Sequence, residues 1–253
     1  MKLCRVREIR ELDRKAIQEY NLPAEILMEN AGNAVYQVIR QEADIAGKSF
    51  VLLCGPGNNG SDGFVVARLL QTNGAVVKVF ILADRVNYRN EAKKNLEILT
   101  RFPVEIDSAQ SLAKIRSSMK TADFIIDALL GTGVNRTIVG ILKQVIGLVN
   151  RSGKKVFAID IASGVNGDSG QEMGVSVKAD YTVTFGLPKA GNLLYPGYGR
   201  GGKLFVSHIS FPTTLTNAPD LKVEIPSLIT LPGRHANTHK MDYGPVLAIA
   251  GAA

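Results

Sequence analysis

The chain has 253 residues, of which 45% are hydrophobic and 21% charged, enough for one full core and the start of a second. No apolar run approaches the roughly 20 residues of a membrane helix, and the N-terminal "MKLCRVREIRELDRK" is charged where a signal peptide is apolar. We therefore expect a cytoplasmic protein without membrane contact. The net charge is +7, but lysines and arginines are scattered and aromatic residues make up only 6%, which argues against a nucleic-acid partner.

Hydrophobic periodicity predicts two N-terminal helices, at residues 5–19 and 23–43. Strand-like and helix-like segments then alternate along the chain. The expected strands are 49–54, 76–82, 123–127, 155–160, 181–185 and 203–209, and the expected helices are 64–73, 88–101, 138–150 and one from a cap at Ser108 to Met119. This order predicts an α/β fold, Rossmann-like and doubly wound, with a mainly parallel sheet, helices on both faces and two N-terminal helices.

Four polar loops begin where predicted strands end: "GPGNNGSDG", "ALLGTGVNRT", "IASGVNGDSG" and "GLPKAGNLLYPG". Ligands of doubly wound sheets bind at this carboxyl edge. The first loop contains G-x-G-x-x-G at Gly55, Gly57 and Gly60, and Asp84 follows the next predicted strand, where dinucleotide enzymes keep a ribose-binding acid. Taken alone, this loop fits a tight turn without a ligand equally well. With three further polar loops beside it, we expect a phosphate-bearing ligand.

Oxygen-bearing side chains at three different strand ends suggest a cation. Asn59, Asp127 and Ser163 offer hard oxygen ligands, although such residues cap turns more often than they bind metals. Only two cysteines occur, Cys4 and Cys54, without the spacing of a disulfide framework or a zinc site.

Five motifs occur in order: "LDRKAIQEYNLPAEILMENAG", "CGPGNNGSDGFVVARLL", "DALLGTGVNR", "DIASGVNGDSG" and "TFGLPKAG". Over roughly residues 1–220 the chain resembles the NAD(P)H-hydrate epimerase family, the YjeF N-terminal domain. The resemblance implies an isomerase of metabolite repair that interconverts the R and S forms of hydrated NADH or NADPH at C6 of the nicotinamide ring.

The resemblance also implies roles for individual residues. Asp160 and Lys189 would be catalytic, and a potassium ion would be held by Asn59, Asp127 and Ser163. The hydrated dinucleotide would contact Asn58, Asn59, Gly60, Ser61, Asp62, Gly131, Thr132, Gly133, Val134, Asn135, Arg136, Thr137 and Asp160.

Three residues depart from the family pattern. Ser61 stands where the family usually has glycine, and Thr137 and Ala162 stand where proline is frequent. If the backbone at Ser61 had a positive φ, serine would cost about 1 kcal/mol there.

The chemistry expected of these residues is simple. C6 of the hydrate bears the ring nitrogen and a hydroxyl, so it can lose hydroxide to a planar iminium, or open to an aldehyde, and re-form on either face. Asp160 would give and take the proton, while potassium and Lys189 hold the substrate.

Residues 221–253 resemble a linker and the truncated start of an ADP- or ATP-dependent hydrate dehydratase domain, with a first strand at Val246–Ala250. We therefore expect a bifunctional enzyme, isomerase and lyase, with the dehydratase domain in the same chain. The oligomeric state is left open, with a homo-oligomer among the options. Two alternatives also stay open: an NAD(P)-dependent oxidoreductase and a non-catalytic nucleotide-binding module.

Overall fold

A computed structural model of the chain describes residues 1–109 and 111–226. The chain divides into two units, and the first, a compact unit, spans Lys2–Glu224. The first unit therefore extends beyond the expected domain boundary at residue 220. The strand expected at Val246–Ala250 lies outside the described residues.

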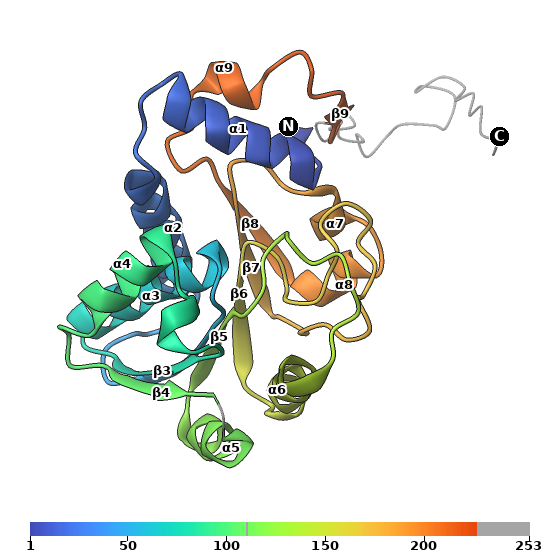
Figure 1. Cartoon of the computed structure of the whole chain (residues 1–253). Helices are drawn as coiled ribbons and strands as arrows, with labels where there is room; N and C mark the ends of the chain where they lie inside the picture. The colour runs from blue at the N-terminus through green and yellow to red at the C-terminus, as the bar shows by residue number, and fades with distance from the viewer. Residues whose placement is uncertain (110, 227–253) are drawn as a thin grey trace, which may run out of the picture. The chain divides into compact units, whose positions relative to one another are not determined.

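The first unit is built on a parallel sheet of seven strands in the order β4-β3-β2-β5-β6-β7-β8 (Figure 1). Every neighbouring pair in this sheet is parallel. The strands are β2 (Ser49–Cys54), β3 (Val76–Ile81), β4 (Glu105–Ser108), β5 (Phe124–Ala128), β6 (Lys155–Ile159), β7 (Tyr181–Phe185) and β8 (Lys203–Ser207). The doubly wound α/β fold predicted from the sequence is thereby confirmed.

The winding direction reverses between β2 and β5. From β2 the chain moves outward through β3 to the edge strand β4, then returns to pair β5 with the other side of β2 and continues to β8. Such a switch point leaves a crevice at the carboxyl ends of the two central strands, because their following loops diverge to opposite faces. The loops after β2 and β5 are two of the polar loops singled out in the sequence.

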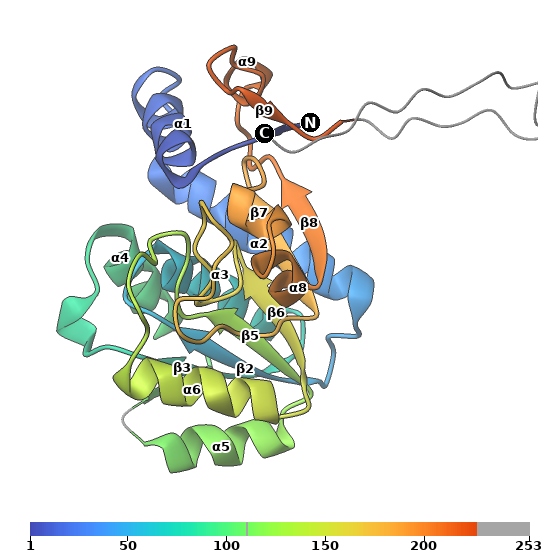
Figure 2. The ribbon, with the colours of Figure 1, turned by 90° about the vertical axis from the view of Figure 1, so that its right-hand side faces the viewer.

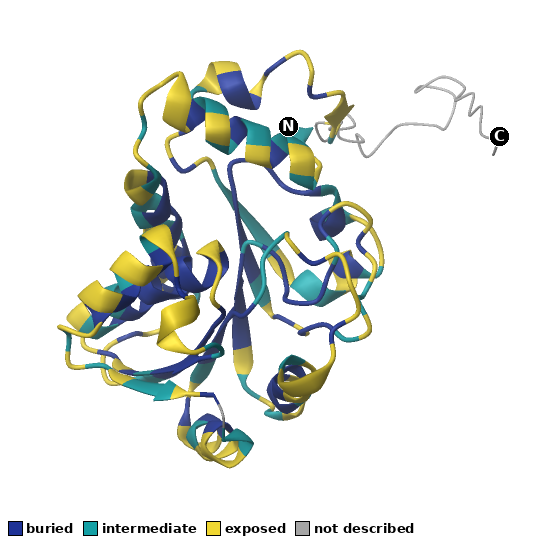
Figure 3. Cartoon of the chain, in the orientation of Figure 1, coloured by how far each residue is buried: buried dark blue, intermediate teal, exposed yellow. Residues whose placement is uncertain are grey.

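Alternate residues of β2 bury the two faces of the sheet. Phe50 and Leu52 belong to a hydrophobic core that also contains residues of α1 (Val6–Gln18), α2 (Ala24–Glu42), α3 (Asn58–Thr72) and α4 (Asn90–Leu99). Val51 and Leu53 pack with α5 (Leu112–Thr121) and α6 (Gly140–Arg151), which lie together on one side in Figure 2. Figure 3 shows the sheet buried between helices whose outer surfaces are exposed, as expected for strands that are covered on both faces.

Short elements complete the unit. β1 (Lys2–Leu3) pairs antiparallel with β9 (Val223–Glu224), so residues expected in the linker belong to this small sheet. The others are the 3₁₀ helix η1 (Arg85–Asn87) and the helices α7 (Ala190–Leu193), α8 (Gly197–Gly201) and α9 (Thr213–Thr216). None of these was predicted from the sequence. Among the described helices, none combines the length and the apolar character needed to cross a membrane.

Two predicted helix starts were wrong, and the edge strand β4 was not predicted. Helix α3 begins at Asn58 and not at residue 64, so most of the glycine-rich segment is helical. Ser108 does not cap a helix but ends β4, and Ser111 caps α5 by accepting the Lys114 N–H at 3.4 Å. In both places the sequence is rich in polar residues or glycine, which do not predict a regular element. Tertiary packing stabilises the start of α3 and the strand β4 there.

Candidate active site

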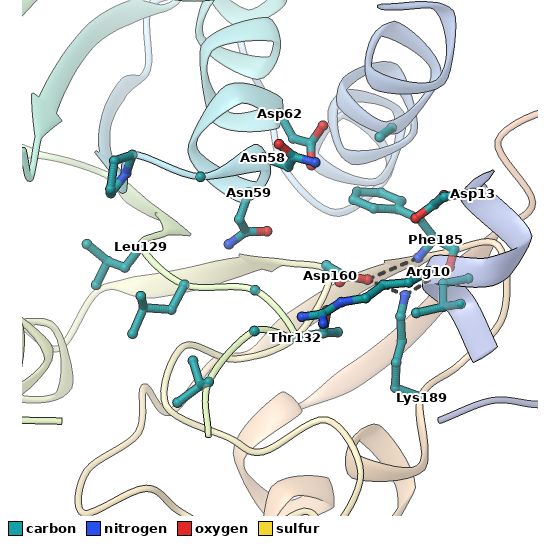
Figure 4. Close-up of a pocket in the computed structure, with 18 of the residues that line it drawn as sticks. Arg10, Asp13, Asn58, Asn59, Asp62, Leu129, Thr132, Asp160, Phe185 and Lys189 are labelled. Atoms are coloured by element: carbon teal, nitrogen blue, oxygen red, sulfur yellow. Dashed lines mark hydrogen bonds and ion pairs between the residues drawn. The ribbon is translucent and has the colours of Figure 1, made fainter. Parts of the chain in front are cut away.

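A cavity of about 910 Å³ opens at the carboxyl edge of the sheet, at the switch point between β2 and β5. Its walls are the start of α3, the loop 129–139 after β5, the ends of β6 and β7, and the inner faces of α1 and α2. Figure 4 shows the polar side chains that these segments direct into it. Three of the four polar loops predicted to meet at this edge contribute lining residues. The loop after β6 contributes none, although Asp160, directly before it, lines the cavity.

The glycines of the first loop serve packing as well as ligand access. A Cβ at Gly55 would lie 2.0 Å from the Leu129 carbonyl oxygen, and a Cβ at Gly60 would lie 1.9 Å from that of Gly55. Gly57 has open space around it, lines the cavity and is the N-cap of α3. The free N–H groups and positive end of α3 therefore face the cavity, which favours an anionic ligand group.

The loop after β5 forms the opposite wall. Gly131 packs against Asn59, since a Cβ there would lie 3.5 Å from Asn59 Oδ1. The Val134 carbonyl accepts a hydrogen bond of 3.0 Å from Asn166 Nδ2, which ties this loop to the loop after β6. Arg10 of α1 reaches toward the same wall, its guanidinium lying 3.8 Å from the Cβ position of Gly133. Asn135, Arg136 and Thr137 are exposed at the cavity rim.

A buried ion pair lies at the ends of β6 and β7. Lys189 Nζ donates to Asp160 Oδ1 at 2.5 Å, to Thr184 Oγ1 at 3.1 Å and to the Phe185 carbonyl at 2.9 Å. The Lys189 side chain is 2% exposed and that of Asp160 15%. All three ammonium protons of Lys189 are therefore used within the protein, while Asp160 Oδ2 accepts no hydrogen bond from any residue the structure describes.

The backbone at Asp160 is strained. Its φ is +68°, a left-handed conformation that few residues other than glycine, asparagine and aspartate adopt. The Asp160 N–H donates to Val183 at 2.7 Å and its carbonyl accepts from Asn192 Nδ2 at 3.3 Å, so the surroundings hold this conformation. Such strain is typical of positions where a side chain must be aimed at a ligand.

Two further carboxyls, Asp13 of α1 and Asp62 of α3, line the same cavity. Burial raises the pKa of Asp13 to about 6, with Lys189 lowering it and Asp160 raising it. Burial, and then the neighbouring carboxylates of Asp160 and Asp13, also raise the pKa of Asp62 well above its usual range. Asp13 and Asp62 therefore keep their protons to a higher pH than exposed aspartates do.

The three residues expected to hold a cation lie around one short segment. Asp127 is fully buried and accepts from the Ser163 N–H at 2.8 Å and Ser163 Oγ at 2.6 Å. Ser163 Oγ in turn contacts the Leu130 backbone, and Gly131 touches Asn59. Both polar atoms of the Asn59 amide are buried without a partner among the described residues. Burial raises the pKa of Asp127 to about 6.

This donor set fits a monovalent cation. An unpaired buried amide oxygen costs free energy unless a ligand satisfies it, and one carboxylate with neutral oxygens suits a weakly charged ion of the hard class. No described residues form a cluster of three or more histidine, cysteine, aspartate or glutamate side chains. The site therefore lacks the ligands typical of zinc.

Most residues expected at the site line the cavity: Asn58, Asn59, Asp62, Asp160, Lys189 and every residue from Gly131 to Thr137. Gly60, Ser61, Asp127 and Ser163 do not. Ser61 lies inside α3 without a positive φ, so the strain considered for it does not occur. Its hydroxyl donates to Met28 Sδ at 3.3 Å and accepts from Asn95 Nδ2 at 2.9 Å, which makes it part of the core behind the cavity.

Sequence reasoning missed the contribution of the N-terminal helices. Arg10, Asp13 and Met28 line the cavity, as does Phe185 at the end of β7. The only sequence signal was Asp13 in "LDRKAIQ". In an amphipathic helix, a charged residue is expected on the exposed surface. Asp84, the acid suggested for ribose binding, does not line the cavity, which weakens the oxidoreductase alternative.

Comparisons with known proteins agree with this architecture. The chain is 45% identical to the bifunctional NAD(P)H-hydrate repair enzyme Nnr of Thermofilum pendens, over all of this chain and 48% of the relative. It is 35% identical to the NAD(P)H-hydrate epimerase of Limosilactobacillus fermentum, over 79% of this chain and 93% of the relative. The crystal structure of yeast ynu0, YNL200c, matches with a TM-score of 0.67 and 25% identity, over 76% of this chain and 84% of that one.

The chain spans about half the length of the bifunctional relatives that it matches. The family model described as YjeF-related protein N-terminus matches residues 24–191. That match covers the start of α3, the loop after β5, Asp160 and Lys189, but not α1. The chain therefore belongs to the family of YjeF-related protein N-termini.

Proposed function

We propose that this chain is an NAD(P)H-hydrate epimerase, an isomerase that interconverts the R and S hydrates of NADH and NADPH at C6 of the nicotinamide ring. The observation that carries the proposal is the Asp160–Lys189 ion pair at the end of a cavity whose far wall is the N-terminus of α3. This arrangement suits a substrate with an anionic diphosphate at one end and a proton-transfer centre at the other. The named relatives include dedicated epimerases of similar length.

The Asp160 carboxylate is arranged for proton transfer. Its Oδ1 is held by Lys189 and Thr184, so the side chain keeps one orientation. Oδ2 accepts no hydrogen bond from the described residues, and Asp160 lines the cavity. A carboxylate fixed in this way can take a proton from the C6 hydroxyl or from a water molecule and return it on the other face. Lys189 has no free N–H, so we assign it the positioning of Asp160 and not a contact with the substrate.

The substrate-binding role is proposed for the residues that line the walls. Asn58, Asp62 and the segment from Gly131 to Thr137 would contact the hydrated dinucleotide, and Gly60 and Ser61 would act indirectly by shaping the first turn of α3. Arg10, exposed at the rim without an ion-pair partner among the described residues, is suited to the diphosphate.

We also propose a potassium ion held by Asn59, Asp127 and Ser163. The unsatisfied Asn59 amide and the buried Asp127 carboxyl support it. When bound, the ion would supply positive charge next to the loop after β5. Asp127 and Ser163 anchor that loop, and Asn59 connects it to α3.

The rest of the protein is a separate proposal. Since the bifunctional relatives are about twice as long as this chain, we propose that a hydrate dehydratase domain, ADP- or ATP-dependent, accompanies it, preceded by a linker. The expected cytoplasmic location stays a prediction.

One experiment separates the proposed activity from its two alternatives. A single purified hydrate epimer is incubated with the protein, and the mixture is chromatographed while its absorbance is followed. Epimerisation gives two peaks at constant nicotinamide absorbance. Hydride transfer to a second substrate changes that absorbance, and a binding module produces neither effect.

A further inference from the structure

The inner face of α1 carries a carboxyl that no motif accounts for. Ile9, Asp13 and Ile17 are spaced four residues apart, so they lie on one face of the helix. All three line the cavity. An aspartate on this otherwise apolar stripe faces the reacting end of the site, and Figure 4 shows its side chain in the same region as Asp62, Asp160 and Lys189.

Asp13 lacks the partners that usually stabilise a partly buried carboxylate. Within residues 1–109 and 111–226 it accepts no hydrogen bond and forms no ion pair. Lys189 is the neighbouring cation, but its three N–H groups already serve Asp160, Thr184 and Phe185. A carboxyl in this position favours its protonated form, in contrast to the ion-paired Asp160.

The charges around Asp13 come from several elements. Asp160 at the end of β6 opposes its ionisation, and Lys189 before α7 favours it. Ionised Asp13 in turn raises the pKa of Asp62 of α3. The Cys4 thiol is also nearby, with burial raising its own pKa to about 12, so it stays neutral. Arg10 lies one turn earlier on α1, and α9, which packs against α1, has no titratable side chain. The balance is a pKa of about 6 for Asp13.

We propose that Asp13 is the second proton-transfer group of the cavity, paired with Asp160 as acid and base. This inference rests on the proposed epimerase function. The two carboxyls come from different walls, α1 and the end of β6, as two groups acting on opposite faces of one ring require.

The steps balance as follows. Protonated Asp13 gives its proton to the C6 hydroxyl, the C6–O bond breaks with its electron pair, and water leaves. The lone pair of N1 forms the N1=C6 double bond of an iminium. A water molecule then adds to the other face of C6, gives a proton to the Asp160 carboxylate, and the π electrons return to N1. Reaction in the opposite direction uses the same two groups with their roles exchanged, and solvent resets the protons.

The test compares Asp13→Asn with the wild-type protein on purified hydrate epimers. Asparagine keeps the volume of the side chain but cannot donate the carboxyl proton. We expect kcat to fall at least about a hundredfold, the usual contribution of a general acid, with substrate affinity measured by direct binding changed less than about threefold. The matched control is Glu11→Gln on the same helix. Glu11 pairs with Arg14 outside the cavity, so this variant should keep wild-type kcat.

A pH profile distinguishes proton donation from a structural role. In the wild-type protein kcat/KM should fall as the pH rises through about 6, the pKa of Asp13, and Asp13→Asn should lose this alkaline limb. The inference is overturned if the variant has near-wild-type kcat, if the limb persists in it, or if wild-type kcat/KM shows no such limb. The wild-type pH profile can overturn the inference even if the variant does not fold. If the wild-type protein interconverts no epimers, the proposed function itself fails, before any variant is compared.

Discussion

Lys189 Nζ lies 2.5 Å from Asp160 Oδ1 and has no solvent-facing proton, since Thr184 and Phe185 accept the other two. The Lys189 backbone is held as firmly. Cys4 donates to the Pro188 carbonyl and accepts from the Ala190 N–H, both at 3.0 Å. The N-terminal segment therefore fixes the lysine, and the lysine fixes the carboxylate that faces the cavity.

Lys189→Met should destabilise the fold as well as abolish activity. The substitution leaves the Asp160 carboxylate without its counter-charge in a buried setting, which typically costs about 3–5 kcal/mol. Urea unfolding monitored by circular dichroism measures this loss. Adding Asp160→Asn to Lys189→Met should recover part of the stability, because no unpaired charge then remains. A double variant no more stable than Lys189→Met would contradict the ion-pair account.

Asp160→Asn alone should abolish epimerisation and keep the fold. Asparagine tolerates the positive φ of 68° at this position better than alanine does, and it preserves the side-chain volume. We expect at least about a hundredfold loss of turnover with a native near-ultraviolet circular dichroism spectrum. Turnover within a few fold of wild type would exclude Asp160 as the proton-transfer group.

The sequence was sufficient for six of the seven strands of the sheet, all but the edge strand β4, and for the edge at which the site forms. Strand runs such as "SFVLLC" are apolar throughout because both faces are covered, and polar loops follow them directly. The start of α3 was not predictable in the same way. Its first turns, "NNGSDG", have poor helix propensity, and only close packing of Gly60 and Gly63 against neighbouring backbone and side chains makes a helix possible there.

Ser61→Gly should lower stability. The cost of serine considered from the sequence required a positive φ at this position, but Ser61 is helical, fully buried and hydrogen-bonded to Asn95. Glycine adds backbone entropy to the unfolded chain and removes that hydrogen bond, for a loss of about 1–2 kcal/mol. Thermal unfolding measures the effect, and Ser61→Ala serves as the control that removes the hydroxyl and its hydrogen bonds but keeps the Cβ. A higher melting temperature for Ser61→Gly would contradict this placement.

Potassium should raise the melting temperature and the activity relative to a bulky organic cation at equal ionic strength. An ion that binds only the folded chain stabilises it by mass action. Asp127→Ala should erase the difference, but it also breaks the contacts with Ser163. Asn59→Ala is the cleaner variant, because the Asn59 amide makes no hydrogen bond within the described residues. A loss of activity on chelation of divalent metals, with indifference to potassium, would refute the assignment.

Asp13→Asn should stabilise the protein above pH 6 and leave its stability unchanged near pH 4. The folded-state pKa of about 6 exceeds the usual 3.8, so folding binds a proton between these values. The stability that Asp13 contributes is present below about pH 4 and is lost as the pH rises through 6. We expect an increase of roughly 2–4 °C in Tm at pH 7.5, which corresponds to about 1 kcal/mol. A Tm difference between the variant and the wild-type protein that stays the same from pH 4 to pH 7.5 would contradict the raised pKa of Asp13.

The contribution of α1 to the site could not be predicted from the sequence, because it depends on long-range packing. Asp13 and Arg10 precede the first strand of the large sheet, and nothing in local periodicity indicates that α1 covers the carboxyl edge of that sheet. The antiparallel pair of β1 with β9 and the bridge between Cys4 and Lys189 place it there. Both contacts join residues almost the full domain apart in sequence, which motif spacing does not reveal.

The most direct measurement starts two reactions, one from the pure R hydrate and one from the pure S hydrate, and follows both by chromatography at constant substrate. An epimerase brings them to the same R to S ratio, at a rate proportional to protein concentration and with no change in nicotinamide absorbance. Two reactions that keep their starting composition, or that converge only as the absorbance changes, would contradict the account.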